Sequence, residues 1–292
     1  NIKLGCQDGR VHPVHLQLHA ETGRQGANLP NVLGFSKVLR NLVVPEEGYG
    51  IGEVDLSQIE VGIAAGFYND HYLIRAFNSG DVYSDMAKGY FKNELQPSDL
   101  QLSSEDFKKA HGQKRASLKT CVLAMLYGGT EYTIRTRLGC SHTIAADLKQ
   151  GFLEMLPQIR DRLSNGVLYD VRRGYVRLVS GLKLFLDPVL SEDARRRLAM
   201  NAPIQGSAAA VFKAAGNRLD KVYQKYGARL LIPLHDSYVF EAPLDCLSEV
   251  AELTRIIMCE TVSEFFPSIL ARAEVNIAHP QSWNKDGLFN AA

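Results

Sequence analysis

The first part of the chain has the pattern of short strands and loops followed by one helix. Residues 11–18 are mostly strand-like, and the Gly-, Asn- and Pro-containing segment 22–31 predicts a loop. Ile51–Leu56 predicts a second strand after several glycine breakers. The apolar spacing then changes to that of a helix over Ser57–Phe67, whose first residue is a suitable N-cap.

The middle of the chain has a mainly helical pattern, from Tyr72 to Leu168. Loops are predicted within it at 93–104 and 128–131. After it, two short apolar runs flank a Ser-Gly dipeptide, which predicts a strand pair at 175–179 and 182–185.

The last part alternates between helix and strand patterns. A long helix is predicted from Ser191 towards Lys225, with a kink at Pro203. Residues 229–242 form two apolar runs with His-Asp-Ser between them, which predicts a β-hairpin with a polar tip. A helix at 247–265 and a strand at 272–277 complete the pattern. Strands at both ends that enclose a helical middle predict an α+β protein whose sheet is completed by distant segments.

Composition limits the class of protein without deciding its function. Of 292 residues, 46% are hydrophobic and 22% charged, the balance of a globular protein with a sizeable core. Five single cysteines indicate reduced thiols and a cytoplasmic location. No apolar run reaches the ~18 residues of a membrane span, and a chain beginning with Asn1 is expected to be a fragment or processed piece. The net charge of +1 is compatible with a nucleic-acid partner, because binding depends on local charge.

Two aspartates stand at the ends of apolar strands, where an unpaired carboxylate is costly to bury. Asp55 ends a predicted strand before the helix that carries Glu60, and Asp236 lies at the hairpin tip beside His235. Each alone would be explained as a turn cap. Together, the two carboxylates could hold a pair of Mg²⁺ ions ~3.5–4 Å apart, with phosphates completing the oxygen shell, as in polymerases and nucleases.

A second candidate lies on the helix predicted over Lys114–Tyr127. Four of its residues recur at every fourth position and share one face: Arg115, Lys119, Leu123 and Tyr127. Cations at one end, then an apolar residue and an aromatic ring, would suit the phosphates and base of a nucleoside triphosphate. An amphipathic helix with a solvated basic end explains the same pattern.

A third candidate is a polar row with the same spacing on the last long helix: Arg197, Asn201 and Gln205. Such a row could donate hydrogen bonds to the acceptors that every base pair presents in the minor groove, without reading sequence. The small residues that follow would let another backbone approach closely. The alternative is a polar stripe that faces solvent.

Six segments resemble motifs of the family A DNA polymerases, the group of bacterial DNA polymerase I, in order and approximate spacing. They are Thr22–Arg24, Asp55–Glu60 (DLSQIE), Arg115–Gly128 (RxxxK, then YG), Arg197–Ala209 (RxxxNxPIQGSAA), His235–Ser237 (HDS) and Trp283. The resemblance covers nearly the whole chain. It implies the palm and fingers region of a right-hand polymerase core, with an antiparallel palm sheet and a mainly helical fingers subdomain.

The resemblance implies a template-directed DNA polymerase with two Mg²⁺ ions as cofactors. Asp55, Asp236 and the Leu56 carbonyl would bind the ions, and the primer 3′-hydroxyl would attack the α-phosphate of the nucleotide in line. Lys119 would act with the two aspartates as a catalytic residue.

The resemblance also implies binding residues for the nucleotide and the DNA. The nucleotide set is Gln58, Glu60, Tyr83, Arg115, Lys119, Leu123 and Tyr127. The DNA set is Arg24, Arg197, Asn201, Gln205 and His235. Within these sets, Glu60 would exclude a ribose 2′-hydroxyl by a steric clash.

Three residues depart from the family pattern and keep two alternatives open. Leu123 stands where a Phe or Tyr is usual, Tyr83 where many relatives have His, and Ser237 where an acidic residue usually follows His-Asp. One alternative is a single-subunit RNA polymerase or ribonucleotide-tolerant polymerase, since HDS also occurs in phage-type RNA polymerases, although these lack the Glu60 gate. The other is a catalytically impaired primer–template binding module, against which Asp55 and Asp236 argue. Because of these departures, a phage or prophage origin is also expected.

The resemblance sets the expected domains and partners. The first part of the palm is expected at 1–65, the fingers at 66–189 and the second part of the palm at 190–292. The expected partners are a primed DNA template and deoxynucleoside triphosphates. Thumb and exonuclease domains are expected outside this chain, processivity or replication factors are further candidates, and no membrane partner is expected. The expected location is the cytoplasm of a bacterial or phage-infected cell.

Overall fold

The computed structural model describes residues 6–278 together with Ser282 and Trp283. The chain forms two compact units. Over the described residues, the first unit draws on residues 6–59, 208–265 and 271–278 with Ser282 and Trp283, and the second on Glu60–Ser207 and Phe266–Leu270. Each unit therefore contains segments that are distant in the sequence.

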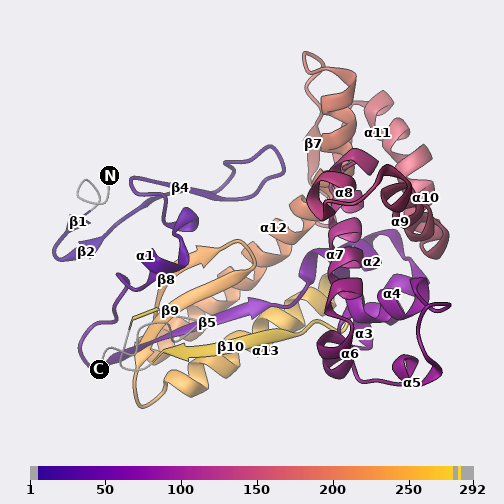
Figure 1. Cartoon of the computed structure of the whole chain (residues 1–292). Coiled ribbons are helices and arrows are strands. Elements are labelled where there is room, and N and C mark those ends of the chain that lie inside the picture. The colour runs from indigo at the N-terminus through magenta and orange to yellow at the C-terminus, as the bar shows by residue number, and fades with distance from the viewer. Residues whose placement is uncertain (1–5, 279–281, 284–292) are drawn as a thin grey trace. The chain divides into compact units, whose positions relative to one another are not determined.

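The first unit is built around a four-stranded antiparallel sheet (Figure 1). Its strands lie in the order β10 (Ala273–Ala278), β5 (Tyr49–Leu56), β9 (Ser237–Pro243) and β8 (Arg229–Leu234). β8 and β9 form the predicted hairpin, with His235 and Asp236 at its tip. β5 and β10 pair although they come from opposite ends of the chain. The predicted α+β fold, with its sheet completed by distant segments, is confirmed.

Two helices cover one face of this sheet (Figure 1). They are α13 (Leu247–Phe265) and the C-terminal half of α12 (Glu192–Tyr226). Tyr238 of β9 stacks on Phe212 of α12 with the ring centroids 4.1 Å apart. The Tyr238 hydroxyl donates to the Phe212 carbonyl over 2.7 Å, which satisfies the one polar group of this buried ring. Helix and sheet are therefore fixed to each other by packing and by a directed hydrogen bond.

The opposite face carries the odd-numbered residues of β5 and β9, because paired residues of antiparallel strands point to the same side. The register partners are Ile51 with Glu241, Glu53 with Val239, and Asp55 with Ser237. Three of these six residues are acidic, so this side is termed the acidic face. A buried apolar cluster covers its middle: Ala27, Val32, Ile51, Ile232, Leu234, Val239 and Trp283.

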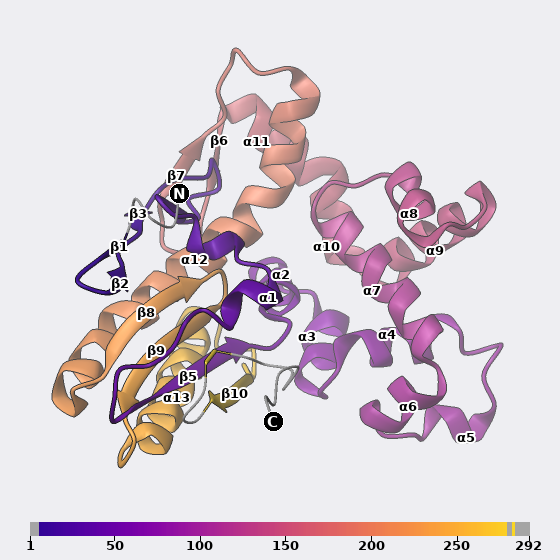
Figure 2. The ribbon, with the colours of Figure 1, turned by 60° about the vertical axis from the view of Figure 1, so that its left-hand side comes forward.

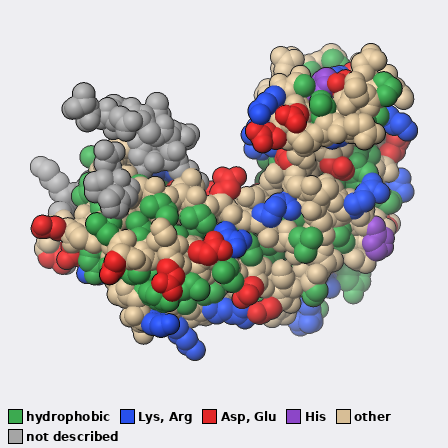
Figure 3. Space-filling model, turned by 90° about the horizontal axis from the view of Figure 1, so that it is seen from below, with side chains coloured by type: hydrophobic (Ala, Val, Ile, Leu, Met, Phe, Trp, Pro, Cys, Tyr) green, Lys and Arg blue, Asp and Glu red, His purple; other side chains and the backbone are tan. Residues whose placement is uncertain are grey.

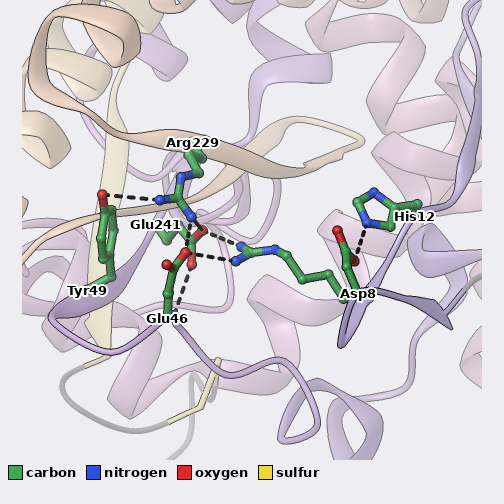
Figure 4. A network of polar contacts seen from close by, with 7 residues as sticks. Asp8, His12, Glu46, Tyr49, Arg229 and Glu241 are labelled. Atoms are coloured by element: carbon green, nitrogen blue, oxygen red, sulfur yellow. Dashed lines mark hydrogen bonds and ion pairs between the residues drawn. The ribbon is translucent and has the colours of Figure 1, made fainter.

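An ion-pair network closes the end of the acidic face that lies away from Asp55 (Figure 4). Glu241 is fully buried and accepts hydrogen bonds from Arg10 and from Arg229, the latter at 3.1 Å. Glu46 bonds both arginines and donates its backbone N–H to Glu241 over 3.2 Å. A buried carboxylate needs such partners because desolvated charge is costly. The network fixes the N-terminal segment to the sheet.

The N-terminal segment forms two short hairpins and two helical turns. They are β1 (Cys6–Gln7) with β2 (Arg10–Val11), β3 (Val14–Leu16) with β4 (Gly26–Asn28), η2 (Val32–Gly34) and α1 (Lys37–Arg40). The strand predicted at 11–18 is thus two shorter strands. The prediction of a loop throughout 22–31 was wrong, because Gly26 pairs with Leu16 and cross-strand bonding overrides the local composition.

The second unit is mainly helical over its described residues. Its helices are α2 (Ile59–Tyr68, shared with the first unit at its first residue), α3 (His71–Asn78), α4 (Val82–Tyr90), α5 (Pro97–Leu100), α6 (Ser104–Ala110), α7 (Gly112–Leu126), α8 (Glu131–Leu138), α9 (His142–Met155), α10 (Pro157–Asp161), η3 (Arg162–Gly166) and α11 (Val167–Arg173). Side chains of Asp70, Ser103 and Ser141 cap α3, α6 and α9 by accepting a backbone N–H of the first turn. The short α5 interrupts the loop predicted at 93–104, and α2 begins at Ile59, so Ser57 is not its N-cap.

The predicted strand pair is confirmed as β6 (Tyr175–Arg177) and β7 (Lys183–Phe185). This hairpin lies beside the first half of α12 (Figure 2), where Ser207 Oγ accepts the Val179 N–H over 3.0 Å. Ala199 and Ala202 of the helix pack with buried residues of the hairpin and α11. The small side chains of α12 therefore allow the close approach that the sequence indicates.

Pro203 lies inside α12 without ending it. Proline has no N–H, so the carbonyl of Ala199 one turn earlier loses its helical partner. Arg162 Nη2 donates to that carbonyl over 3.0 Å and also pairs with Asp170. The replacement bond explains how the helix continues for 35 residues.

The surface carries charges of both signs. Figure 3 shows Lys and Arg side chains interspersed with Asp and Glu on the face that it presents, in keeping with the net charge of +1. Among the described helices, none combines the length and the apolar character needed to cross a bilayer. The cysteines whose side chains are described are free thiols: Cys121, Cys140, Cys246 and Cys259.

Candidate functional site

Asp55 and Asp236 lie at the ends of neighbouring strands in the first unit. Asp55 is the register partner of Ser237, the residue that follows Asp236. The backbone N–H of Leu56 donates to the Asp236 carbonyl over 3.1 Å. Both aspartates are partly exposed, whereas Leu56 and Ser237 are buried. The sheet thus brings the two predicted metal-binding aspartates to one place. In the described part of the chain, no group of three or more His, Cys, Asp or Glu side chains is placed to hold a metal.

The segments that carry the two aspartates each contain a residue with a left-handed backbone. Gln58 has φ +54° in the turn between β5 and α2, and His235 has φ +53° at the tip of the hairpin. Non-glycine residues adopt positive φ uncommonly, and such conformations are found at functional sites more often than elsewhere. His235 is exposed and Gln58 half-buried, so the imidazole at the tip is accessible to a ligand.

The loop that carries Arg24 is fixed to the rest of the first unit by two long side chains. Lys213 of α12 donates to the carbonyls of Gln17 and Gly23, at 2.6 and 2.9 Å. Gln25 donates to the carbonyl of Pro233, two residues before His235, over 2.8 Å. Arg24 is therefore held near the base of the hairpin whose tip carries Asp236.

Arg115 on α7 is bound by a carboxylate in the second unit. Its Nε and Nη2 donate to the two oxygens of Asp81 at 2.5 and 2.9 Å, in bidentate geometry. Asp81 also accepts from Ser84 Oγ at 2.5 Å. The guanidinium and the carboxylate are 17% and 14% exposed, so the pair is mostly shielded from water. This pairing orients Arg115 and competes with any phosphate that the guanidinium binds.

Tyr83 packs beneath the two cations of α7. Its ring centroid lies 5.4 Å from the Arg115 guanidinium carbon and 5.7 Å from Lys119 Nζ. The ring is 3% exposed, and burial, with the nearby charge of Glu60, raises the pKa of its phenol. Tyr83 therefore stays protonated, and its buried ring packs against both cations. Lys119 itself is exposed.

The far end of α7 turns towards α12. Tyr127 follows the last helical residue, and Gly128 next to it has φ +75°. A Cβ at Gly128 would lie 3.3 Å from Met200 Sδ and 3.6 Å from Arg197 Cγ. A residue with a side chain would be strained by this backbone and would crowd Met200, so glycine is favoured here. Leu123 and Tyr127 are half-buried on the face that also bears Arg115.

The predicted polar row on α12 occupies one exposed to half-buried stripe of the second unit. Arg197 is exposed, and Asn201 and Gln205 are half-buried. The Oδ1 atom of Asn201 is buried without a hydrogen-bond partner among the described residues.

The comparisons with known proteins assign this fold and these motifs to one family. The sequence profile of DNA polymerase family A matches residues 2–285. The chain belongs to DNA polymerase family A. It is 29% identical over 290 residues to DNA polymerase I of Chloroflexus aurantiacus, covering 95% of this chain and 29% of that protein. It is likewise 29% identical over 262 residues to a thermostable DNA polymerase I of Thermus thermophilus, covering 86% of this chain and 30% of that protein.

A solved family A structure has the same fold. The POL domain of Pol1 from M. smegmatis, in complex with DNA primer-template and dNTP, is similar with a TM-score of 0.81 and 28% identity. The match covers 96% of this chain and 49% of that one. These findings confirm the family resemblance and the polymerase-core fold. The chain spans 29–30% of the length of the two curated relatives above.

Sequence reasoning missed three residues beside the family motifs. Glu53 is a buried carboxylate two positions before Asp55, Asp81 is the partner of Arg115, and Lys213 anchors the Arg24 loop. The sequence did contain a signal for Glu53, because an acidic residue inside an apolar strand needs a partner when it is buried. The other two had none, because their roles depend on segments that are distant in the sequence.

Proposed function

We propose that this chain is the core of a template-directed DNA polymerase that adds deoxynucleotides to a primer 3′ end. The observation that carries the proposal is the junction of β5 and β9, which unites Asp55 and Asp236 in a family A fold. The first unit would act as palm, and the helices from α3 to α11 as fingers. The reaction is an in-line attack of the primer 3′-hydroxyl on the α-phosphate, with pyrophosphate as the leaving group.

The residues at the junction fit a pair of Mg²⁺ ions. The donors are the carboxylates of Asp55 and Asp236 and the carbonyl of Leu56, all hard oxygen ligands. Mg²⁺ usually takes one or two protein carboxylates and completes its shell with water and substrate phosphates, which agrees with a site of only two carboxylates. When bound, such ions favour the ionised primer hydroxyl and stabilise charge on the leaving group. The protein's own part is to hold both carboxylates in register.

The triphosphate would bind the exposed face of α7. Lys119 is exposed and free to approach a phosphate, and Arg115 is oriented by Asp81 above the Tyr83 ring. Asp81 holds the guanidinium in one orientation, and a phosphate would compete with this carboxylate for its N–H donors. We propose Gln58, Leu123 and Tyr127 as further contacts of the nucleotide.

Glu60 would select deoxyribose over ribose in that nucleotide. It lies in the first turn of α2, close enough to Tyr83 for its charge to raise the pKa of the phenol. A carboxylate in that position excludes a ribose by a clash with its 2′-hydroxyl. This assignment favours a DNA polymerase over the ribonucleotide-tolerant alternative.

We propose that the primer–template contacts the polar row of α12, Arg24 and His235. Arg197, Asn201 and Gln205 carry N–H donors along one exposed to half-buried stripe of α12, which suits the acceptors of the minor groove. Arg24 and His235 would approach the primer from the first unit. Contacts of Arg24 and Arg197 with phosphates would weaken as salt rises, and the whole set would depend little on sequence.

The test is primer extension on a short primed DNA template with Mg²⁺, using the chain and, where it is part of a longer protein, the intact protein. Single deoxynucleotides and ribonucleotides are supplied separately opposite each template base. The proposal predicts that only the matched deoxynucleotide is added efficiently. Equal use of ribonucleotides would favour the RNA-polymerase alternative. Binding of primed DNA without any extension would favour the impaired binding module.

A further inference from the structure

Glu53 is a charged residue with almost no contact with solvent. It is 2% exposed and lies on the acidic face, two positions before Asp55. A buried carboxylate is tolerated only with hydrogen-bond donors around it. The indole Nε1 of Trp283 donates to Glu53 Oε2 over 2.8 Å, and Ser237 Oγ lies 3.4 Å from Glu53 Oε1. Trp283 and Ser237 are themselves each 2% exposed.

These contacts lead directly to the turn that carries Asp236. Ser237 is the register partner of Asp55, and Glu53 lies diagonally across from it on the same face. Ser237 Oγ also lies 3.2 Å from the Leu234 carbonyl, on the other side of the two-residue turn. The serine therefore touches both strands at the base of the turn, and Glu53 supports it from β5.

Trp283 is fixed independently of Glu53. Its backbone N–H donates to the Val43 carbonyl over 2.9 Å, and the Arg40 guanidinium lies 4.5 Å from its ring centroid. Because the indole is anchored by these other contacts, its hydrogen bond holds the Glu53 carboxylate in one orientation. A chain of contacts runs from Trp283 through Glu53 to Ser237 and the catalytic turn.

The chemistry of positions 53 and 237 is complementary. A serine at 237 supplies a hydroxyl to the Glu53 carboxylate, whereas an acidic residue there would put two buried negative charges side by side. The family resemblance implies an acidic residue after His-Asp, where this chain has Ser237. The acidic group of the region is supplied from the neighbouring strand.

We propose that Glu53 is a positioning residue for the metal-binding turn, and that it takes over on β5 the acidic function expected at position 237. This inference rests on the proposed polymerase function. Glu53 acts through Ser237 on the geometry of Asp236 and needs no contact with the nucleotide. A carboxylate at position 237 of β9 should therefore be able to replace the one at position 53 of β5.

The test exchanges the two side chains, using Glu53→Ser, Ser237→Glu and the double variant. In primer extension, Glu53→Ser should lower kcat about 10- to 100-fold. It should also raise the Mg²⁺ midpoint, the Mg²⁺ concentration that gives half the maximal rate, about tenfold. Effects of this size are usual when a residue that orients metal ligands is lost. KM for the deoxynucleotide should stay within about threefold, because Glu53 does not bind it. The double variant should recover kcat to within about fivefold of wild type, since the carboxylate returns to the same pocket.

Thermal unfolding without substrate gives a reading that does not depend on catalysis. Ser237→Glu should melt lower than the double variant, because only the single variant holds two carboxylates in the pocket. Glu241→Gln is the matched control, a buried carboxylate at the other end of the same face. It should lower the unfolding midpoint and leave the Mg²⁺ midpoint unchanged.

The outcomes separate this inference from the proposed function. If wild type does not extend a primer, the polymerase proposal fails, and the melting comparison still decides whether the carboxylate is exchangeable. If wild type extends and Glu53→Ser matches it in kcat and Mg²⁺ midpoint, the positioning role is wrong. A double variant no better than both single variants in extension and melting also contradicts the exchange.

Discussion

Leu56 and Asp236 are joined by a backbone hydrogen bond of 3.1 Å at the point where β5 ends and β9 begins. The bond joins Leu56, whose carbonyl is a proposed metal ligand, to Asp236, which supplies the second proposed carboxylate ligand. Backbone bonds of this kind are set by sheet register, which the buried residues on both faces of β5 and β9 specify. The precision of the proposed metal site therefore comes from the sheet and not from the exposed side chains.

The Arg115–Asp81 pair predicts an energetic coupling that urea unfolding can measure. Removing either partner leaves a mostly buried group without its bidentate contact, so Arg115→Ala and Asp81→Ala should each cost about 1–3 kcal/mol. The double variant should cost less than the sum of the two by about 1–2 kcal/mol. Strict additivity would show that the pair does not stabilise the second unit.

Glu60→Ala should relax the choice of sugar. Without the carboxylate, a 2′-hydroxyl meets no obstacle, so the ratio of kcat/KM for deoxy- over ribonucleotides should fall about 100-fold. Single-nucleotide incorporation with each substrate measures the ratio. An unchanged ratio would remove Glu60 from the site and reopen the RNA-polymerase alternative.

Stability should fall at alkaline pH. Burial raises the pKa of the Cys121 thiol from 9.0 to about 12, and it raises the pKa of the Tyr83, Tyr223 and Tyr238 phenols above 10.0. Above about pH 9 the unfolded chain loses protons that the folded state keeps, so stability present below that pH is lost as pH rises. The thermal midpoint should therefore decline between about pH 9 and 11. A midpoint that rises over this range would contradict the assignment.

Gly128→Ala should be more damaging than Gly139→Ala. Both glycines have positive φ, +75° and +63°, so each substitution costs about 1–2 kcal/mol of backbone strain. Only Gly128 also has Met200 and Arg197 close to the added Cβ. Thermal unfolding should show the larger loss for Gly128→Ala, and nucleotide incorporation should fall only in that variant. Equal effects of the two would show that the turn after Tyr127 tolerates displacement.

Much of the fold could be predicted because local and global signals agree. The helix at 247–265 and the hairpin around His235 are present as expected, since their apolar spacing matches the surfaces that they bury. β4 was missed because its Gly- and Asn-containing segment is ordered by pairing with β3. The start of α2 was misplaced because Gln58 adopts a left-handed turn, and the Ser57 N–H bonds Arg272 from a distant segment.

The candidate site was only partly visible in the sequence. Motifs identified Asp55 and Asp236, and strand pairing accounts for their meeting. Glu53, Asp81 and Lys213 act through contacts with residues far away in the chain, which spacing alone does not reveal. The roles of Arg24, Arg197, Asn201 and Gln205 towards DNA stay predictions.

Single-nucleotide incorporation by Asp55→Asn and Asp236→Asn decides whether the two carboxylates at the β5–β9 junction carry the reaction. Each variant keeps the shape of the side chain and removes the charge that would hold Mg²⁺. We expect incorporation at least about a thousandfold slower than wild type, with the affinity for primed DNA and the thermal midpoint nearly unchanged. Incorporation at the wild-type rate by either variant would contradict this expectation.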